Sequence, residues 1–164
     1  PDVFEDDRGF FQETFSQERY ASIGIDSPFI QDNHSRSSKG VLRGLHYQRK
    51  KPQGKLVRVV TGSVFDVAVD IRSDSETYGQ WQSVELTEEN KKQLWIPPGF
   101  AHGFLVLSDI VDFEYKCTDY YDSSDNGIIH WQDPDLAIDW PKCIGMTISK
   151  RDQSAPSFKS LKKV

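Results

Sequence analysis

The sequence predicts an all-β protein, a barrel or sandwich with only short peripheral helices. Residues 64–71 and 111–117 alternate strictly between two faces, which is the pattern of strands with one buried side. Further short apolar runs recur at close spacing between turn-forming residues, as in sandwiches and barrels. No Ser/Gly/Pro-rich linker divides the 164 residues. We therefore expect one domain over residues 1–164.

The composition narrows the classes of partner and compartment. The net charge of -5 and the charged fraction of 27% are ordinary, so we expect no polyanion-binding surface and no nucleic-acid partner. No apolar run approaches the roughly 18 to 20 residues that cross a bilayer, and we expect no membrane association. Cys117 and Cys143 lie far apart without a CxxC spacing, which favours free thiols in a reducing cytoplasm. The numbering starts at Pro1 instead of Met, which is compatible with a missing initial segment.

Local signals place the individual elements. Residues 17–23 are predicted to form a short helix, with Ser16 as N-cap and Gly24 as stop. Alternation in residues 111–117 puts Tyr115 on the apolar face, so we expect Tyr115 to point into the barrel. The predicted strands cover residues 40–48, 55–60, 64–71, 80–86, 93–96, 103–107, 111–117 and 127–131.

The stretch GVLRGLHYQ, residues 40–48, has the features of a functional strand. Glycine inside a strand marks a bulge or a close backbone approach. Strict alternation would put Arg43 and His46 on opposite faces, but a bulge at Gly44 would reset the parity and bring both into one pocket. The alternative is a satisfied core histidine with Arg43 as a surface charge, and this stretch alone does not decide between them.

Residues 97–104 carry a Pro-x-Gly-x-x-His turn that resembles the second motif of the cupin superfamily. Gly62, in a Gly-x-Val-x-x-Val hairpin, fits the end of the first motif. Metal-binding cupins have His-x-His and a Glu there, whereas His46 stands alone. Only His46 and His102 remain as ligands, fewer than the usual three, so we expect no metal and no cofactor.

An ordered series of segments resembles one cupin family, the dTDP-4-dehydrorhamnose 3,5-epimerases. The resemblance implies a cupin jelly-roll barrel and is carried by residues 7–13, 31–35, 40–48, 54–58, 65–70, 94–104, 115–121, 133–141 and 149–152. It implies inversion of dTDP-4-dehydro-6-deoxy-D-glucose at C3 and C5 to dTDP-4-dehydro-L-rhamnose.

The resemblance also implies roles for the matching positions. His46 matches the base next to the sugar ketone, with Asp152 as its partner. Tyr115 matches the acid on the other face, and Lys55 the group that stabilises the enolate oxygen. The positions that match substrate contacts are Arg8, Phe11, Glu13, Gln31, Asn33, Arg43, Asp66, His102, Tyr121 and Arg151. Tyr121 matches the ring that stacks on thymine. Residues near Arg8 to Glu13 match a segment that enters the partner's site in a homodimer, and Asn126 departs from a position that is often Glu.

The chemistry needs these residue types. A proton next to a ketone is too weakly acidic for imidazole unless the enolate is stabilised, and an ammonium group such as that of Lys55 supplies that charge. A carboxylate on the second ring nitrogen fixes the histidine tautomer and stabilises the imidazolium. Inversion requires a proton from the opposite face, the role expected for Tyr115.

Three alternatives remain open from the sequence. A related epimerase that inverts only C3 or only C5 would differ in pocket shape. A non-catalytic cupin that binds a sugar nucleotide is disfavoured by Lys55, His46 and Tyr115 together. A metal-dependent cupin oxygenase is disfavoured because the chain lacks His-x-His. Taken alone, Lys55 and Asp152 would be surface charges, so the interpretation depends on the ordered set.

Overall fold

Strands dominate the structure, a computed structural model that describes residues 1–161. In chain order the strands are β1 (Val3–Asp6), β2 (Gly9–Gln12), β3 (Gln31–Ser38), β4 (Val41–Gln48), β5 (Lys55–Thr61), β6 (Ser63–Asp70), β7 (Trp81–Thr87), β8 (Gln93–Ile96), β9 (Phe100–Val106), β10 (Ile110–Cys117), β11 (Asn126–Ile128) and β12 (Thr147–Ile148). The helical elements are α1 (Gln17–Ser22), α2 (Lys150–Gln153) and the 3-10 turn η1 (Phe158–Ser160). The predicted all-β class with short peripheral helices is confirmed.

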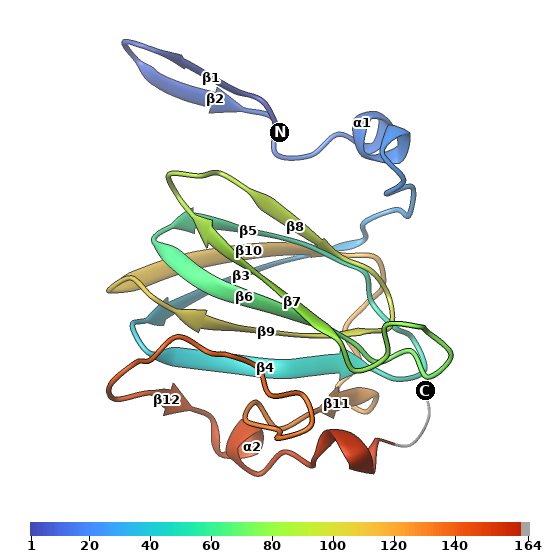
Figure 1. The fold of residues 1–164 in the computed structure, drawn as a ribbon. Helices are drawn as coiled ribbons and strands as arrows, with labels where there is room; N and C mark the ends of the chain where they lie inside the picture. Colours follow the sequence, from blue (N-terminus) through green and yellow to red (C-terminus); the bar gives the residue numbers. More distant parts are fainter. Residues whose placement is uncertain (162–164) are drawn as a thin grey trace.

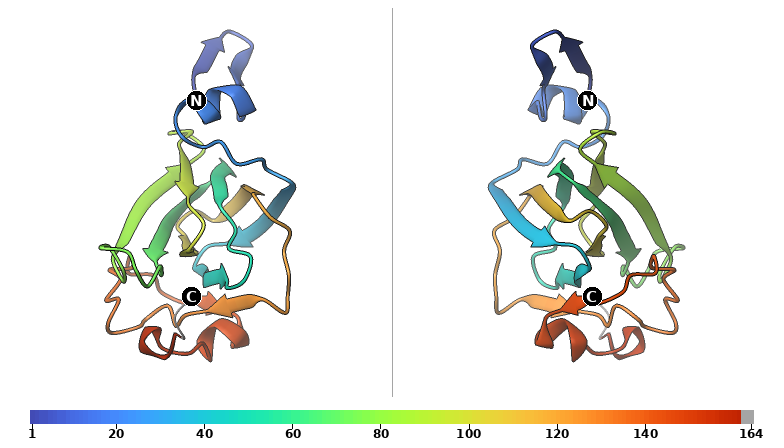
Figure 2. Two further views of the ribbon diagram at one scale, coloured as in Figure 1. Left: turned by 90° about the vertical axis from the view of Figure 1, so that its right-hand side faces the viewer. Right: turned by 90° about the vertical axis from the view of Figure 1, so that its left-hand side faces the viewer.

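Two antiparallel sheets form the body of the molecule. One has the strand order β3-β10-β5-β8, and the other the order β11-β4-β9-β6-β7 with β12 alongside β4. β12 pairs with β4 in parallel. The sheets face each other around a common interior, and the chain after β11 runs beneath β4 (Figures 1 and 2).

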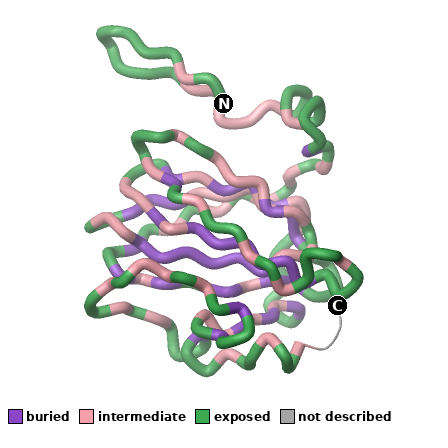
Figure 3. Tube along the Cα trace, in the orientation of Figure 1, coloured by how far each residue is buried: buried purple, intermediate pink, exposed green. Residues whose placement is uncertain are grey.

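Side chains alternate between the two faces of the sheet that contains β6, and each face packs into its own apolar core. Val64 and Ala68 pack inside the barrel against Phe113 and other residues of the facing sheet. Val67 and Val69 belong to the second core, with Leu136 and other residues of the chain after β11. The buried residues follow these central strands in Figure 3. The predicted division of residues 64–71 between two faces is confirmed. A single domain over residues 1–164 stays a prediction.

Two glycines allow β4 and β9 to approach closely. Gly44 has φ +130, and a Cβ built on it would lie 2.5 Å from the Cα of Gly103. The pairing of β4 with β9 shifts register between Arg43 and His46. On β9, Phe104 lies opposite Arg43 and His102 opposite His46. Because Phe104 and His102 are two residues apart, they share a face. Of the two alternatives that the sequence left open for Arg43 and His46, the structure therefore has the one with a parity reset at Gly44.

The N-terminal hairpin of β1 and β2 projects away from the barrel (Figures 1 and 2). The side chains of Phe4, Phe10 and Phe11 are exposed. The hairpin contacts the body at the β7–β8 turn, where the Gln12 amide donates to the Lys91 carbonyl and the Lys91 ammonium lies over the Phe10 ring. Isolated two-stranded hairpins are at best marginally stable in water.

Several predicted boundaries were wrong by a few residues. Helix α1 ends at Ser22, one residue early, and the Ser16 side chain makes no capping hydrogen bond, although Gly24 follows with φ +91. Strand β9 begins at Phe100, because residues 100–102 pair with β6 before the predicted start at Gly103. Strand β11 ends at Ile128 instead of residue 131, because its pairing with β4 stops at His46.

Four strands and one helix were not predicted. Strands β1 and β2 are largely exposed. Strand β3 consists of polar residues, so it has no apolar periodicity that could predict a strand. Strand β12 has two residues and α2 has four. None of the helices in the described part of the chain has the length and apolar character that crossing a bilayer requires.

Candidate active site

One cavity of about 230 Å³ opens between the two sheets at the ends of β4, β5 and β10. The residues that line it are Gln31, Asn33, His46, Tyr47, Gln48, Gln53, Lys55, Tyr115, Cys117, Tyr121 and Asn126. Six of these were predicted site residues: Gln31, Asn33, His46, Lys55, Tyr115 and Tyr121. The fold therefore brings together side chains that are far apart in sequence.

His46 is held by a carboxylate from the C-terminal segment. Its Nε2 lies 2.8 Å from Oδ1 of Asp152, and the backbone N–H of Gly44 lies 3.5 Å from Oδ2 of the same carboxylate. Asp152 is fixed at the start of α2, because its backbone N–H donates to the Ser149 hydroxyl. Burial alone would raise the pKa of Asp152, but the hydrogen bond and charge of His46 lower it below its ordinary value. The carboxylate is thus ionised and leaves the other ring nitrogen of His46 available.

A second histidine–carboxylate pair lies next to the first. His102 is the cross-strand partner of His46, and its Nε2 lies 2.9 Å from Oδ2 of Asp66. Both side chains are buried, whereas the His46 side chain is 36% exposed. Arg43 precedes the bulge, and its guanidinium donates to the Ser37 hydroxyl.

Lys55 and Cys117 are cross-strand partners at one wall of the cavity. Burial lowers the pKa of Lys55 from its ordinary value, while Cys117 and Asp66 act in the opposite direction. Burial raises the pKa of the Cys117 thiol, which the nearby Lys55 charge partly offsets. The wall therefore presents the amine of Lys55 beside a neutral thiol.

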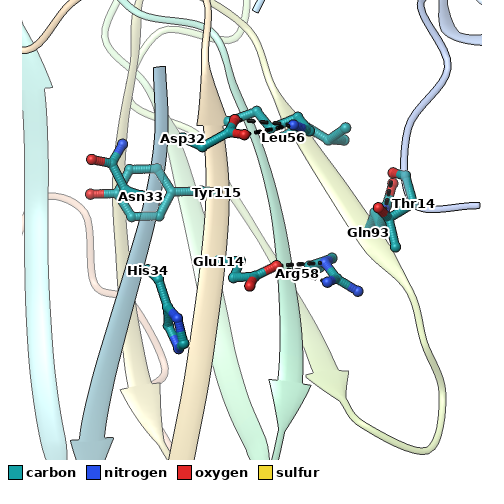
Figure 4. Close-up of a pocket in the computed structure, with 10 residues that line it drawn as sticks. Thr14, Asp32, Asn33, His34, Leu56, Arg58, Gln93, Glu114 and Tyr115 are labelled. Carbon is teal, nitrogen blue, oxygen red and sulfur yellow. Dashed lines mark hydrogen bonds and ion pairs between the residues drawn. The ribbon is translucent and has the colours of Figure 1, made fainter. Parts of the chain in front are cut away.

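Tyr115 comes from β10 and packs against the interior core, as predicted. Figure 4 shows Tyr115 and Asn33 on one side of β10 and Glu114 with Arg58 on the other. Burial raises the pKa of the Tyr115 hydroxyl, and the Arg43 charge acts against this. The hydroxyl is therefore protonated at neutral pH and able to donate a proton.

Polar side chains form the outer end of the cavity. The Asn126 amide donates to the Tyr121 hydroxyl over 3.0 Å, and the Tyr121 backbone N–H donates to Oε1 of Gln31 over 2.9 Å. The Gln31 amide in turn donates to Oδ1 of Asn33. Arg151 donates to the Asn126 carbonyl over 3.4 Å. This end combines an aromatic ring, amides and a cation.

Eight of the fourteen predicted site residues are not among those that line the cavity. Five of these, described above, are Arg43, Asp66, His102, Arg151 and Asp152. The other three lie in or next to the projecting hairpin. Arg8 pairs with Asp6 within the projecting hairpin, Phe11 is exposed there, and Glu13 lies 3.4 Å from Arg19. None of the three lines the cavity.

Several lining residues were not predicted. Gln48 stood in the motif at residues 40–48, and Cys117 on the predicted inner face of residues 111–117, but neither had a role attached. Asn126 was noted only for its departure from the family pattern. Gln53 gave no signal in the sequence, because an isolated Gln before a strand is usually exposed. Among residues 1–161, no group of three or more His, Cys, Asp or Glu side chains is arranged to hold a metal ion, and a metal-free site stays a prediction.

Comparisons with known proteins agree with this geometry. The protein-family model described as dTDP-4-dehydrorhamnose 3,5-epimerase matches residues 1–160. The enzyme of that name from Escherichia coli K12 is 57% identical over 155 residues, which cover 93% of this chain and 84% of that one.

Solved structures share the fold. The crystal structure of dTDP-6-deoxy-D-glucose-3,5-epimerase from Legionella pneumophila, in complex with dTDP-4-keto-L-rhamnose, has a TM-score of 0.97 and 55% identity, covering 99% of this chain and 87% of that one. A 3'-monoepimerase from Streptomyces bikiniensis, in complex with dTDP-quinovose, has a TM-score of 0.91 and 34% identity, covering 98% of this chain and 82% of that one. The predicted cupin jelly-roll barrel is confirmed. The chain belongs to the dTDP-4-dehydrorhamnose 3,5-epimerase family.

Proposed function

We propose that this enzyme inverts dTDP-4-dehydro-6-deoxy-D-glucose at C3 and C5 to give dTDP-4-dehydro-L-rhamnose. The observation that carries the proposal is the meeting of His46, Lys55 and Tyr115 in one cavity, with Asp152 bonded to His46. These groups are a base, a cation and an acid, which is the set that enolisation of a ketone and reprotonation need.

In this mechanism His46 removes the proton next to the C4 ketone. Asp152 stabilises the imidazolium that forms, because its carboxylate is bonded to the ring and kept ionised. Lys55 places its ammonium at the ketone oxygen, where negative charge develops. An interaction of this kind, removed by mutation, typically costs about 10² to 10³ in kcat.

Tyr115 returns a proton to the opposite face of the enolate. Its neutral hydroxyl lines the same cavity as His46 and Lys55. Because enolisation of one ketone acidifies both neighbouring carbons, the same pair of groups serves C3 and C5 in turn. Arg43 and the buried His102–Asp66 pair shape the pocket around the sugar, next to the base.

The nucleotide occupies the outer end of the cavity. With the sugar at His46, the diphosphate and base extend toward Tyr121, Gln31, Asn33 and Arg151. An aromatic face such as that of Tyr121 stacks on a base, and the ring is half exposed. Arg151 supplies a cation for the diphosphate. The Legionella relative in complex with a dTDP-sugar supports a ligand of this class.

Inversion of a single carbon is the second candidate. The 3'-monoepimerase relative has the same fold at a TM-score of 0.91, so the fold does not separate one inversion from two. The higher identity to double epimerases, 57% and 55%, favours inversion of both carbons. A non-catalytic sugar-nucleotide binder would need neither the Asp152–His46 pair nor Lys55.

The projecting hairpin supports the proposal of a homodimer. Phe4, Phe10 and Phe11 expose large apolar faces, and exposed patches of this kind mark interaction surfaces. The outer face of the β3-β10-β5-β8 sheet carries a groove of about 350 Å³ lined by Arg58 and Glu114, among others (Figure 4). We propose that a second copy covers these surfaces and that Arg8, Phe11 and Glu13 enter the partner's site. A cytoplasmic location fits the two free cysteines.

Proton NMR in heavy water tests the proposed activity. Incubation with dTDP-4-dehydro-6-deoxy-D-glucose is expected to give deuterium at both C3 and C5, with the inverted product trapped by a reductase. Deuterium at one carbon alone would assign the single epimerase. An absence of exchange while dTDP binds would contradict the proposed activity and leave a binding protein.

A further inference from the structure

Among residues 1–161, two amides that line the cavity, those of Gln53 and Asn126, keep a free oxygen. Of these two, Asn126 is the one bonded to the Tyr121 hydroxyl. Its Nδ2 donates to the Tyr121 hydroxyl, and its Oδ1 accepts no hydrogen bond from residues 1–161. Gln31, Asn33 and Gln48 have both the amide oxygen and the amide nitrogen engaged, by one another, by the backbone or, for the Asn33 nitrogen, by the Cys117 sulfur. Asn126 therefore offers a free acceptor and a second N–H to a ligand at the outer end.

The contact with Tyr121 allows the Asn126 amide to turn over. A phenol hydroxyl both donates and accepts. It accepts from Nδ2 in the orientation observed and would donate to Oδ1 after a half-turn of the amide. In each orientation, either the amide nitrogen or the amide oxygen is bonded to the Tyr121 hydroxyl, and the other atom is left for a ligand.

Pyrimidine bases differ in the edge that such an amide would meet. Thymine and uracil present an N3–H donor beside carbonyl oxygens, whereas cytosine presents an N3 acceptor beside an amino group. An amide matches the first edge in one orientation and the second in the other. A carboxylate only accepts, so it matches the N3–H edge and opposes the N3 lone pair of cytosine.

We propose that Asn126 sets the base selectivity of the site, and that its amide admits cytosine as well as thymine and uracil nucleotides. The inference rests on the proposed function, which puts the base against Tyr121. The substrate class then widens from dTDP-sugars to pyrimidine nucleoside diphosphate sugars with the same 4-keto sugar.

The readout must be a ratio of affinities. Arg151 donates to the backbone carbonyl of Asn126, so a carboxylate at position 126 would also attract this cation away from a bound diphosphate. That effect weakens every nucleotide alike. The ratio of dTDP to dCDP affinity removes it, and dUDP serves as the control with the thymine-type edge and no methyl group.

Isothermal titration of the chain of residues 1–164 with dTDP, dUDP and dCDP tests the proposal. We expect the wild type to bind dCDP within about tenfold of dTDP, and Asn126→Asp, which keeps the size and removes the donor, to raise that ratio by about tenfold or more. The dTDP-to-dUDP ratio should not change. Asn126→Glu should behave as Asn126→Asp does.

Three results would contradict the inference. One is a wild type that already excludes dCDP as strongly as Asn126→Asp does, and another is an unchanged ratio in both carboxylate variants. The third concerns Tyr121→Phe, which frees the amide and should keep the wild-type ratio; a rise equal to that of Asn126→Asp would contradict the role of the amide. Each of these results leaves the proposed epimerase intact while dTDP binds, whereas a lack of dTDP binding would overturn both.

Discussion

His46 and His102 are cross-strand partners on β4 and β9, and each is paired with its own carboxylate. The two pairs differ in access. The side chains of His102 and Asp66 are 8% and 0% exposed, whereas that of His46 is 36% exposed. Only the His46 pair borders the cavity that Lys55 and Tyr115 share. This difference in access supports our proposal that His46 is the base and that the second pair is a buried support.

Replacement of the base should separate chemistry from binding. His46→Ala is expected to lower kcat by about 10² to 10⁴, while the Kd for dTDP stays within about threefold, because the base acts on the sugar. Steady-state kinetics and calorimetry measure the two quantities. His130→Ala is the matched control, since His130 stacks on Trp131 outside the cavity. A His46→Ala enzyme as fast as the control would show that the base is another group.

The charge of Lys55 should set the alkaline limit of activity. Burial lowers the pKa of Lys55 below its ordinary 10.5, whereas the pKa of Tyr115 is raised above 10. We expect kcat to fall at alkaline pH as Lys55 loses its proton, because the neutral amine no longer supplies charge to the enolate oxygen. Lys55→Arg should keep part of the activity and shift this limit upward, because a guanidinium stays charged. An unshifted limit in Lys55→Arg would assign it to another group.

The same lowered pKa of Lys55 predicts the opposite trend for stability. Between the folded pKa and 10.5, the unfolded chain binds more protons at Lys55 than the folded chain does, so the free energy of unfolding rises with pH across this window. Below the window both states are protonated and the gain is absent. Urea unfolding of wild type and Lys55→Met, compared at increasing pH, measures the contribution. It should appear only in the wild type, and parallel curves would contradict the lowered pKa.

The close approach of β4 and β9 should make Gly44 irreplaceable. Gly44→Ala adds a Cβ that would meet the Gly103 backbone at 2.5 Å, at a φ of +130. We expect a loss of roughly 3 kcal/mol or more in unfolding free energy, together with loss of activity. Gly24→Ala is the control, because its φ is also positive but its Cβ would meet nothing within 4 Å. Strain alone costs about 1 to 2 kcal/mol, and equal losses in both variants would rule out the clash.

The proposed exchange of hairpins predicts complementation between two inactive variants. If Arg8 serves the partner's site, a heterodimer of His46→Ala and Arg8→Ala chains contains one site with both residues intact. Random reassortment should then restore about one quarter of wild-type activity. Each variant alone stays slow. A mixture no faster than its components, although exchange of subunits is verified by native mass spectrometry, would place Arg8 in its own chain's site or outside catalysis.

The sequence was informative where one face of a strand is apolar. The alternation in residues 111–117 predicted the inward direction of Tyr115. The glycine in residues 40–48 indicated that the parity could reset there, which is how Arg43 and His46 come to share one face. Strand β3 was not predicted from the sequence because its residues are polar on both faces. Asn33, on one face, lies at the cavity, while His34, on the other, pairs with Asp112. Periodicity carries no information for such a strand.

Long-range pairings lay beyond any local pattern. Asp152 meets His46 across 106 positions of sequence, and neither residue type indicates the other. Only the resemblance to a family linked them. The packing of Leu136, Ile138 and Trp140 against the sheet that contains β6 was likewise not predicted. These apolar residues lie in an irregular segment without a repeating period. The contacts that the sequence could not predict are therefore those of chain segments without periodicity that pack against the sheets.

Two-sided proton transfer is the central claim, and Tyr115→Phe in heavy water tests it most directly. Proton NMR follows deuterium entry at C3 and C5 together with inversion of the sugar. If His46 removes the proton and Tyr115 returns one to the opposite face, Tyr115→Phe should slow inversion by about 10² or more while deuterium still enters through His46. Equal losses of exchange and inversion would contradict the assignment of Tyr115 as the acid.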